Sequence, residues 1–518
     1  MRFLMRIVAI PTLIFLFVSI TQIDVVNAQT VSVGKGSYST TLPAGAVGPS
    51  TISGLPAVPK ISTEFNQLVN TNDYWSSLIF PRQENKNSNA IYAHPLTIQA
   101  KKFGFRVGHI SAYEINGIAY NYPIDRDLEI SLAGQLSNRT SAHSYGDWSF
   151  TAKMEYDNAS LLATTGHGLP YIFFEVSEGE VQIAPAATPD IWHNENEVIG
   201  MSVNGKHYGL FAPSGSIWSG SDTLNSALND IGFLSVAILP DSTSQTLEFF
   251  RSHAYAQVTN SIVSWNYDEV SSDLNTTFTY ETILRDSSNG NSDETLTALY
   301  RHQWINTAEP LTNYSYVSPR GEMKLIEGNS FTTSTRFSGI LPSLPDLGEY
   351  NRIQLLEYVQ DVAKEILPIT DTYNNGKQMG RFSELVHIAD QLGAIAERDY
   401  FLDEIKLRLE DWFTTGGAQE YSYNETWNTL TGYPASFGSD REINDHHFHA
   451  AYAIKSAATI AQYDSAWASQ ENWGGMVNLL IRDANNWNHD DEILPFLRNF
   501  DPYAGHARSE EHTSELQS

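Results

Sequence analysis

The hydrophobic periodicity of the chain changes near Pro345, and this change constrains the fold more than any other sequence feature. From residue 30 to about 290, apolar and polar residues alternate in short runs such as Leu128–Leu132, the pattern of half-buried antiparallel strands. After Pro345, apolar residues recur every three or four positions, as they do on one face of a helix. A β-rich part followed by an α-helical part is therefore expected, and 518 residues are enough for two or three domains.

Two Asn-Gly pairs predict β-hairpins in the first part. Asn204-Gly205 and Asn116-Gly117 each lie between two apolar runs, and an Asn-Gly pair supplies the two positive-φ residues of a type I′ turn. Many short strands with turns between them favour an antiparallel β-sandwich, which we expect over residues 29–290. The turn-rich residues 291–345 are expected to connect the two parts.

Five helices are expected between residues 346 and 507. Three are predicted by apolar stripes, and two more are expected near 445–463 and 475–486. Successive helices of this kind suggest a helical toroid, which five helices cannot close. The stripes consist of Leu355, Val359, Val362 and Ile366; of Phe382, Leu385, Val386, Ala389 and Leu392; and of Leu402, Ile405, Leu409 and Trp412.

Neither end of the chain is expected to belong to the fold. Residues 1–28 have the basic start, short apolar run and small-residue cleavage site of a secretory signal, which predicts export to the periplasm, the cell surface or the medium. No later segment is apolar enough to span a membrane. Residues 508–518 read RSEEHTSELQS and match the conceptual translation of a common sequencing-adapter oligonucleotide. We interpret this tail as an artefact, so the natural sequence would be interrupted at about Ala507, inside a domain.

The composition excludes several classes of function. The chain has 31 Lys and Arg against 60 Asp and Glu, a net charge of −29, so nucleic acids and anionic membranes are poor partners. The absence of cysteine excludes disulfides, thiolate metal sites and cysteine nucleophiles. There is no phosphate-binding glycine loop and no Gly-x-Ser-x-Gly elbow, so no cofactor is expected. A monomer is expected.

The densest group of chemically capable side chains is Asn444–His449, which reads NDHHFH. In a helix, Asp445 and His449 form an i,i+4 pair on one face, so an imidazole would lie beside a carboxylic acid. Two alternatives remain open. In the first, Asp445 caps the helix and has no catalytic role. In the second, Asp445, His446 and His449 bind a metal together with His506.

The segment from Asp371 to Ala507 resembles the catalytic domain of glycoside hydrolase family 81, the endo-β-1,3-glucanases. Shorter pieces upstream extend the resemblance over nearly all of the mature chain. The resemblance implies a β-sandwich, a small α/β connector and a C-terminal (α/α)6 barrel, which would be incomplete here. The segments that carry it are Asp371–Tyr373 with Gly376-Lys377, Tyr433–Asp440, Glu442–His449, Phe496–Arg498, Phe500–His506, and upstream Tyr74–Leu78, His302–Trp304, Arg320-Gly321 and Gly339–Pro342.

The resemblance also implies residue roles. Asp445 would be the general acid of an inverting mechanism and His449 its helper, while other motif residues would contact the sugar. The general base would be a glutamate beyond Gly505-His506, which is missing from this chain, so the chain as given is expected to be inactive. Ala450-Ala451 stand where the family usually shows Tyr-Gly. The expected substrate-contacting residues are Tyr373, Lys377, His446, Asp501 and His506.

The expected activity is endo-hydrolysis of β-1,3-glucans of the laminarin, callose or curdlan kind. A non-catalytic glucan-binding protein is the first alternative. A polysaccharide lyase is a weaker one, because lyases that act on uronates need positive charge to hold the substrate carboxylates, and this chain is strongly acidic.

Overall fold

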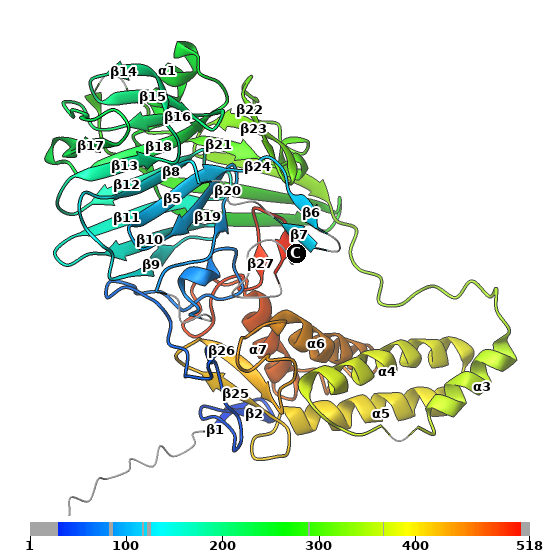
Figure 1. Ribbon diagram of the computed structural model, residues 1–518. Coiled ribbons are helices and arrows are strands. Elements are labelled where there is room, and N and C mark those ends of the chain that lie inside the picture. Colours follow the sequence, from blue (N-terminus) through cyan, green and yellow to red (C-terminus); the bar gives the residue numbers. More distant parts are fainter. Residues whose placement is uncertain are drawn as a thin grey trace, which may run out of the picture.

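A computed structural model describes residues 30–81, 86–116, 119–121, 126–288, 291–365 and 367–508. The β-rich part and the helical part lie at opposite ends of the molecule, and the segments that follow α7 reach from the helical part to the sheets (Figure 1). The change of periodicity near Pro345 therefore corresponds to the change of architecture. None of the described helices is both long and apolar enough to cross a membrane.

Two antiparallel sheets form a sandwich-like body and contribute side chains to one core. The larger sheet has the order β14-β15-β16-β18-β12-β11-β10-β9 and the smaller one β17-β13-β8-β5-β4-β3. The bounds are Ile91–Tyr92 (β3), Leu96–Ala100 (β4), Gly104–His109 (β5), Leu128–Leu132 (β8), Arg139–Tyr145 (β9), Ser149–Glu155 (β10), Ser160–Gly166 (β11), Tyr171–Val176 (β12), Val181–Pro185 (β13), Asp190–Glu195 (β14), Val198–Val203 (β15), Lys206–Phe211 (β16), Leu224–Ser226 (β17) and Phe233–Leu239 (β18).

The hairpin predicted at Asn204-Gly205 is confirmed. Strands β15 and β16 pair with Val203 opposite Lys206, and the two turn residues have φ of 53° and 76°. At the second predicted hairpin, β6 (Glu114–Asn116) pairs with β7 (Ala119–Asn121). Its turn is residues 117–118, which lie outside the described residues.

The expected boundary at residue 290 cuts through a continuous sheet. Strand β24 pairs with β20, which itself forms a long hairpin with β19. A second small sheet has the order β21-β23-β22. The bounds are Ser244–His253 (α1), Ala256–Asp268 (β19), Asp273–Leu284 (β20), Leu296–Leu299 (β21), Arg301–Trp304 (α2), Ser315–Ser318 (β22), Gly321–Glu327 (β23) and Ser330–Arg336 (β24), with short 3-10 turns at Ser76–Leu78 (η1) and Leu228–Asp230 (η2).

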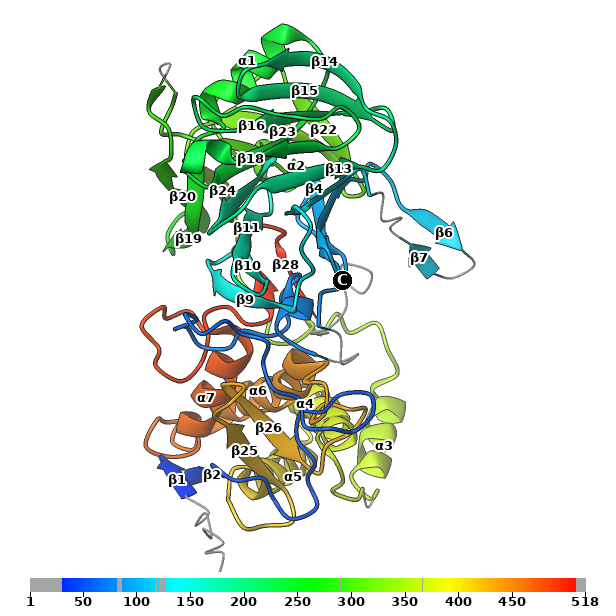
Figure 2. The same ribbon diagram turned by 60° about the vertical axis from the view of Figure 1, so that its left-hand side comes forward.

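The first two described strands do not join the sandwich. Strands β1 (Thr30–Val33) and β2 (Gly36–Ser39) form a hairpin, and β2 lies parallel to β25 (Glu420–Asn424), which pairs with β26 (Thr429–Tyr433). Figure 2 shows this small sheet beside the helices, away from the sandwich. Period-two alternation predicts a strand but not its partner, and here the partner is almost 400 residues away.

The helices follow the predicted stripes closely. They are α3 (Arg352–Val362), α4 (Thr372–Leu392), α5 (Ile395–Trp412), α6 (His446–Tyr463) and α7 (Gly474–Asn485). Helix α4 ends at Leu392 and is followed by Gly393, which has a left-handed φ of 69°. The apolar faces of these helices form a second core. Ile366 of the first predicted stripe lies outside the described residues.

Candidate active site

Asp445 is the residue from which α6 starts, but it does not cap the helix. Its backbone is left-handed, with φ of 50° and ψ of 25°, and its carboxylate accepts no hydrogen bond from the first turn. The side chain is half-buried, and this burial raises the pKa of the carboxyl group above its usual value. The carboxyl is therefore available for chemistry and holds its proton to a higher pH than a free aspartate.

His449 lies one helical turn after Asp445 and is fixed by α4. Its Nδ1 lies 2.7 Å from the hydroxyl oxygen of Thr372, the first residue of α4, and both side chains are buried. Burial, with a smaller contribution from the charge of His446, lowers the pKa of His449 to about 4. His449 is therefore a neutral imidazole at the pH at which most enzymes work.

The start of α4 brings two further predicted residues to the same place. The Tyr373 ring lies 5.8 Å from the His449 ring, centroid to centroid, and the ammonium group of Lys377 lies 5.3 Å from the centroid of the Tyr373 ring. Asp371 caps α4 by accepting hydrogen bonds from the backbone amides of Tyr373 and Asn374, which fixes the first turn. Tyr373, Lys377 and His449 therefore form one group.

An open pocket of about 860 Å³ is lined by residues 43–47, by residues 416–420 and by the loop of residues 433–442, and it is linked to this group through Phe437. Phe437 lines the pocket, is 69% exposed, and packs edge-on against Tyr373 at 4.8 Å. An exposed aromatic face at the edge of a pocket is the kind of surface on which an apolar ligand face can stack. Between His446 and His449, in contrast, the free space is about 20 Å³, enough for one water molecule.

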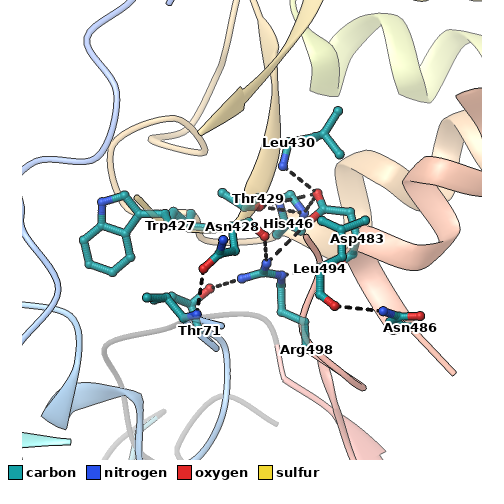
Figure 3. A network of polar contacts seen from close by, with 12 residues as sticks. Thr71, Trp427, Asn428, Thr429, Leu430, His446, Asp483, Asn486, Leu494 and Arg498 are labelled. Atoms are coloured by element: carbon teal, nitrogen blue, oxygen red, sulfur yellow. Dashed lines mark hydrogen bonds and ion pairs between the residues drawn. The ribbon is translucent and has the colours of Figure 1, made fainter. Parts of the chain in front are cut away.

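His446 turns away from this pocket into the protein. Its Nε2 donates a hydrogen bond of 2.6 Å to Oδ2 of Asp483 in α7 (Figure 3). Both side chains are buried. His446 was expected to contact the substrate, but its described contact is this buried carboxylate.

Asp501 and His506 contact the β-rich part of the molecule. Asp501 is buried, and its Oδ2 lies 3.0 Å from Nε2 of His167, just after β11. Although burial alone would raise it, the pKa of Asp501 is lowered, chiefly by the charge of His167. His506 lies 3.1 Å from a guanidinium nitrogen of Arg320. These contacts place both residues at the junction with the sheets, and none joins them to the Asp445 group.

The chain belongs to glycoside hydrolase family 81. The model of the glycosyl hydrolase family 81 C-terminal domain matches residues 349–514. A family 81 glycoside hydrolase structure from Clostridium thermocellum, solved as a mutant, is 40% identical and superposes with a TM-score of 0.88 over 93% of this chain and 67% of that one.

Two curated proteins named glucan endo-1,3-beta-D-glucosidase are also similar. The protein from Thermobifida fusca is 42% identical over 94% of this chain and 65% of its own length. The one from Acetivibrio thermocellus is 41% identical over 86% of this chain and 58% of its own. The chain thus spans less than two thirds of either relative. Because the alignments include both parts, the family resemblance extends beyond the NDHHFH segment.

The described side chains of this family 81 chain do not form a metal site. Within the described ranges, no three His, Asp or Glu side chains are arranged to hold a metal ion. Two of the three histidines considered as ligands use ring nitrogens elsewhere, His446 on Asp483 and His449 on Thr372.

Sequence reasoning missed Asp483 and Thr372. A signal for Asp483 was present, because it continues the apolar stripe of Met476, Leu479 and Leu480 on α7 at helical spacing. A carboxylate on a core-facing stripe must be buried and paired. Thr372 carried no comparable signal, because a threonine at the first position of a helix is unremarkable.

Proposed function

We propose that this protein is a secreted, monomeric endo-β-1,3-glucanase that cleaves glucans of the laminarin, callose or curdlan kind with inversion. The observation that carries the proposal is the half-buried Asp445 carboxyl, with its raised pKa, in a family 81 chain 42% identical to a curated glucan endo-1,3-beta-D-glucosidase. We also propose that α3 to α7 belong to an (α/α)6 barrel.

In this mechanism Asp445 donates its proton to the glycosidic oxygen as the C1–O bond breaks. Water attacks C1 from the opposite face, and a second carboxylate takes the proton of the water, which requires the two carboxyl groups to stand about 6.5–9.5 Å apart. In the proposal that second group is a glutamate beyond Gly505-His506, as the family resemblance implies. A raised pKa suits Asp445 for the role of acid, because the proton must be present at working pH.

The neighbouring residues have supporting roles in the proposal. His449 is neutral and is held by Thr372, so it fixes the first turn of α6 after Asp445 and adds no charge to the site. Tyr373 and Phe437 offer aromatic surface, and Lys377 offers a hydrogen-bond donor to sugar hydroxyls. A neutral glucan is compatible with the net charge of −29, whereas a polyuronate would be repelled.

The test is the stereochemistry and bond specificity of the protein expressed from the whole gene. Proton NMR during early hydrolysis of unbranched β-1,3-glucan should show the α-anomer first, and chromatography should show oligosaccharides of mixed length. A β-1,4-linked glucan of equal length serves as the control and should remain intact. Initial β-anomer would overturn the inverting mechanism. Glucan binding without any cleavage would favour the glucan-binding alternative.

A further inference from the structure

The backbone that carries Asp445 is held in an unfavourable conformation. Ile443 and Asp445 have φ of 57° and 50°, in the left-handed region that L-residues rarely adopt. For a β-branched residue such as isoleucine this is a marked outlier. A strained backbone of this kind persists only where the surroundings enforce it. Contacts from outside the loop must therefore hold this segment.

On the N-terminal side of Asp445, the loop is held by two amide side chains and by burial. Asn72 donates from its side-chain amide to the carbonyl of Ile443 at 3.3 Å, and Asn444 donates to the carbonyl of Phe437 at 3.2 Å. The Ile443 side chain is fully buried in the same core as the sandwich. These contacts fix the residues before the acid.

On the C-terminal side, the described side-chain anchor is His446, bound to Asp483. The same Asp483 oxygen accepts a hydrogen bond of 2.9 Å from the backbone amide of Leu430, and Arg498 lies 3.5 Å from the other oxygen. Arg498 in turn donates to the Thr71 hydroxyl at 2.9 Å. Figure 3 shows these groups converging from α6, β26, α7, the segment after α7 and the segment before the sandwich.

Asp483 stays ionised although it is buried. Burial tends to raise its pKa, but His446, Arg498 and the Leu430 amide together lower it below the usual value. The other titratable side chains that interact with it electrostatically are Tyr421 and Tyr423 of β25, and burial raises the pKa of both phenols. The anchor therefore keeps its charge throughout the range in which an enzyme is assayed.

We propose that Asp483 is a positioning residue for the general acid, because it holds His446 and thereby fixes the strained backbone and the burial of the adjacent Asp445. The inference rests on the proposed function of Asp445. In this inference His446 supports the general acid and does not contact the sugar, which agrees with the burial of the His446 and Asp483 side chains.

A positioning role of Asp483 has a measurable consequence that a purely structural role lacks. Because burial raises the pKa of Asp445, a looser loop would admit water and lower that pKa. The alkaline limb of the pH–rate profile, where the acid loses its proton, would then move to lower pH. The titratable or charged groups on the surrounding elements are Asp371, Tyr373 and Lys377 on α4, Asp440, Arg441 and Glu442 on the preceding loop, and His446, His447 and His449 on α6.

The experiment compares Asp483→Asn with wild type in the protein expressed from the whole gene, with kcat and KM measured on an unbranched β-1,3-glucan from pH 5 to 9. We expect kcat to fall by about 10²-fold, as small misplacements of a catalytic group do, with KM little changed and the alkaline limb at lower pH. The matched control is Asp127→Asn. Asp127 is equally buried and accepts hydrogen bonds from Tyr208 at 2.6 Å and Asn204 at 2.9 Å, but lies in the sandwich.

If Asp483→Asn does not fold, two variants of His446 test the same positioning role. His446→Gln can still donate to Asp483 and should keep the limb near its wild-type position, whereas His446→Ala should shift it. An unshifted limb in the variants that fold, or an equal shift in Asp127→Asn, would overturn the positioning role while leaving the proposed function intact. A wild-type protein that does not cleave β-1,3-glucan would refute both the proposed function and the positioning role.

Discussion

Replacing Asp445 by asparagine should abolish most of the activity without unfolding the protein. The carboxylate makes no capping hydrogen bond, and asparagine tolerates the left-handed backbone of this position as well as aspartate does. The side chain is only half-buried. We therefore expect the free energy of unfolding to change by less than about 0.5 kcal/mol, which urea unfolding followed by tryptophan fluorescence can measure.

The expected loss of rate follows from the chemistry of the leaving group. An amide cannot donate the proton that the glycosidic oxygen needs, so kcat on unbranched β-1,3-glucan should fall by about 10²–10⁴-fold. This corresponds to about 2.7–5.4 kcal/mol of lost transition-state stabilisation. KM should change little, because Tyr373 and Lys377 on α4 are untouched.

A substrate with a good leaving group separates acid catalysis from every other role. A dinitrophenyl β-1,3-oligoglucoside expels a phenolate that needs no proton, so the deficit of Asp445→Asn should shrink strongly on this substrate. Near-native rates on the polysaccharide would refute the assignment of the acid. An equal deficit on both substrates would refute it too, because it would indicate lost binding or water activation instead.

Three further perturbations follow from the contacts around the site. Thr372→Val leaves Nδ1 of His449 buried without its partner, which should cost about 1–3 kcal/mol of stability in urea unfolding and lower kcat. Phe382→Ala removes a buried ring that packs on α5 and lies 5.5 Å from the Arg408 guanidinium, so thermal unfolding should show a loss of about 3–5 kcal/mol. The pKa of His447 and of His449 is lowered to about 4 by burial; since the unfolded chain binds these protons near pH 6.5, stability should fall as pH drops from 6.5 to 4, and His449→Gln should flatten that dependence. An unchanged urea midpoint across that range would contradict the last expectation.

Local patterns predicted the local structure well. Three apolar stripes predicted α3, α4 and α5, although α4 and α5 begin ten and seven residues before their stripes, and the helices expected near 445–463 and 475–486 are α6 and α7. The Asn204-Gly205 turn was confirmed with both residues at positive φ. These elements are determined by periodicity and turn chemistry, which operate over a few neighbouring positions. The pairing of β2 with β25 was not predictable, because nothing in an alternating pattern specifies a partner so far along the chain.

The sequence did not separate the motif residues that gather near His449 from those that contact the β-rich part. Tyr373 and Lys377 do join His449, but Asp501 is paired with His167 of the β-rich part. A string of polar residues in a motif marks positions with specific partners, and it does not distinguish a sugar partner from a buried protein partner. Only burial and contacts separate the two cases.

Two of the three histidines in the NDHHFH segment show how that separation arises. Helix α6 packs against both α4 and α7. His446 and His449 are three positions apart, so they project about 60° from one another around the helix axis, and one reaches Asp483 on α7 while the other reaches Thr372 on α4. Phe448 lies on the opposite side and is half exposed. Asp445 therefore lies where α6 packs between α4 and α7, with the backbone on either side of it held by buried contacts. The spacing of His446 and His449 reflects the two helices they contact rather than a shared ligand.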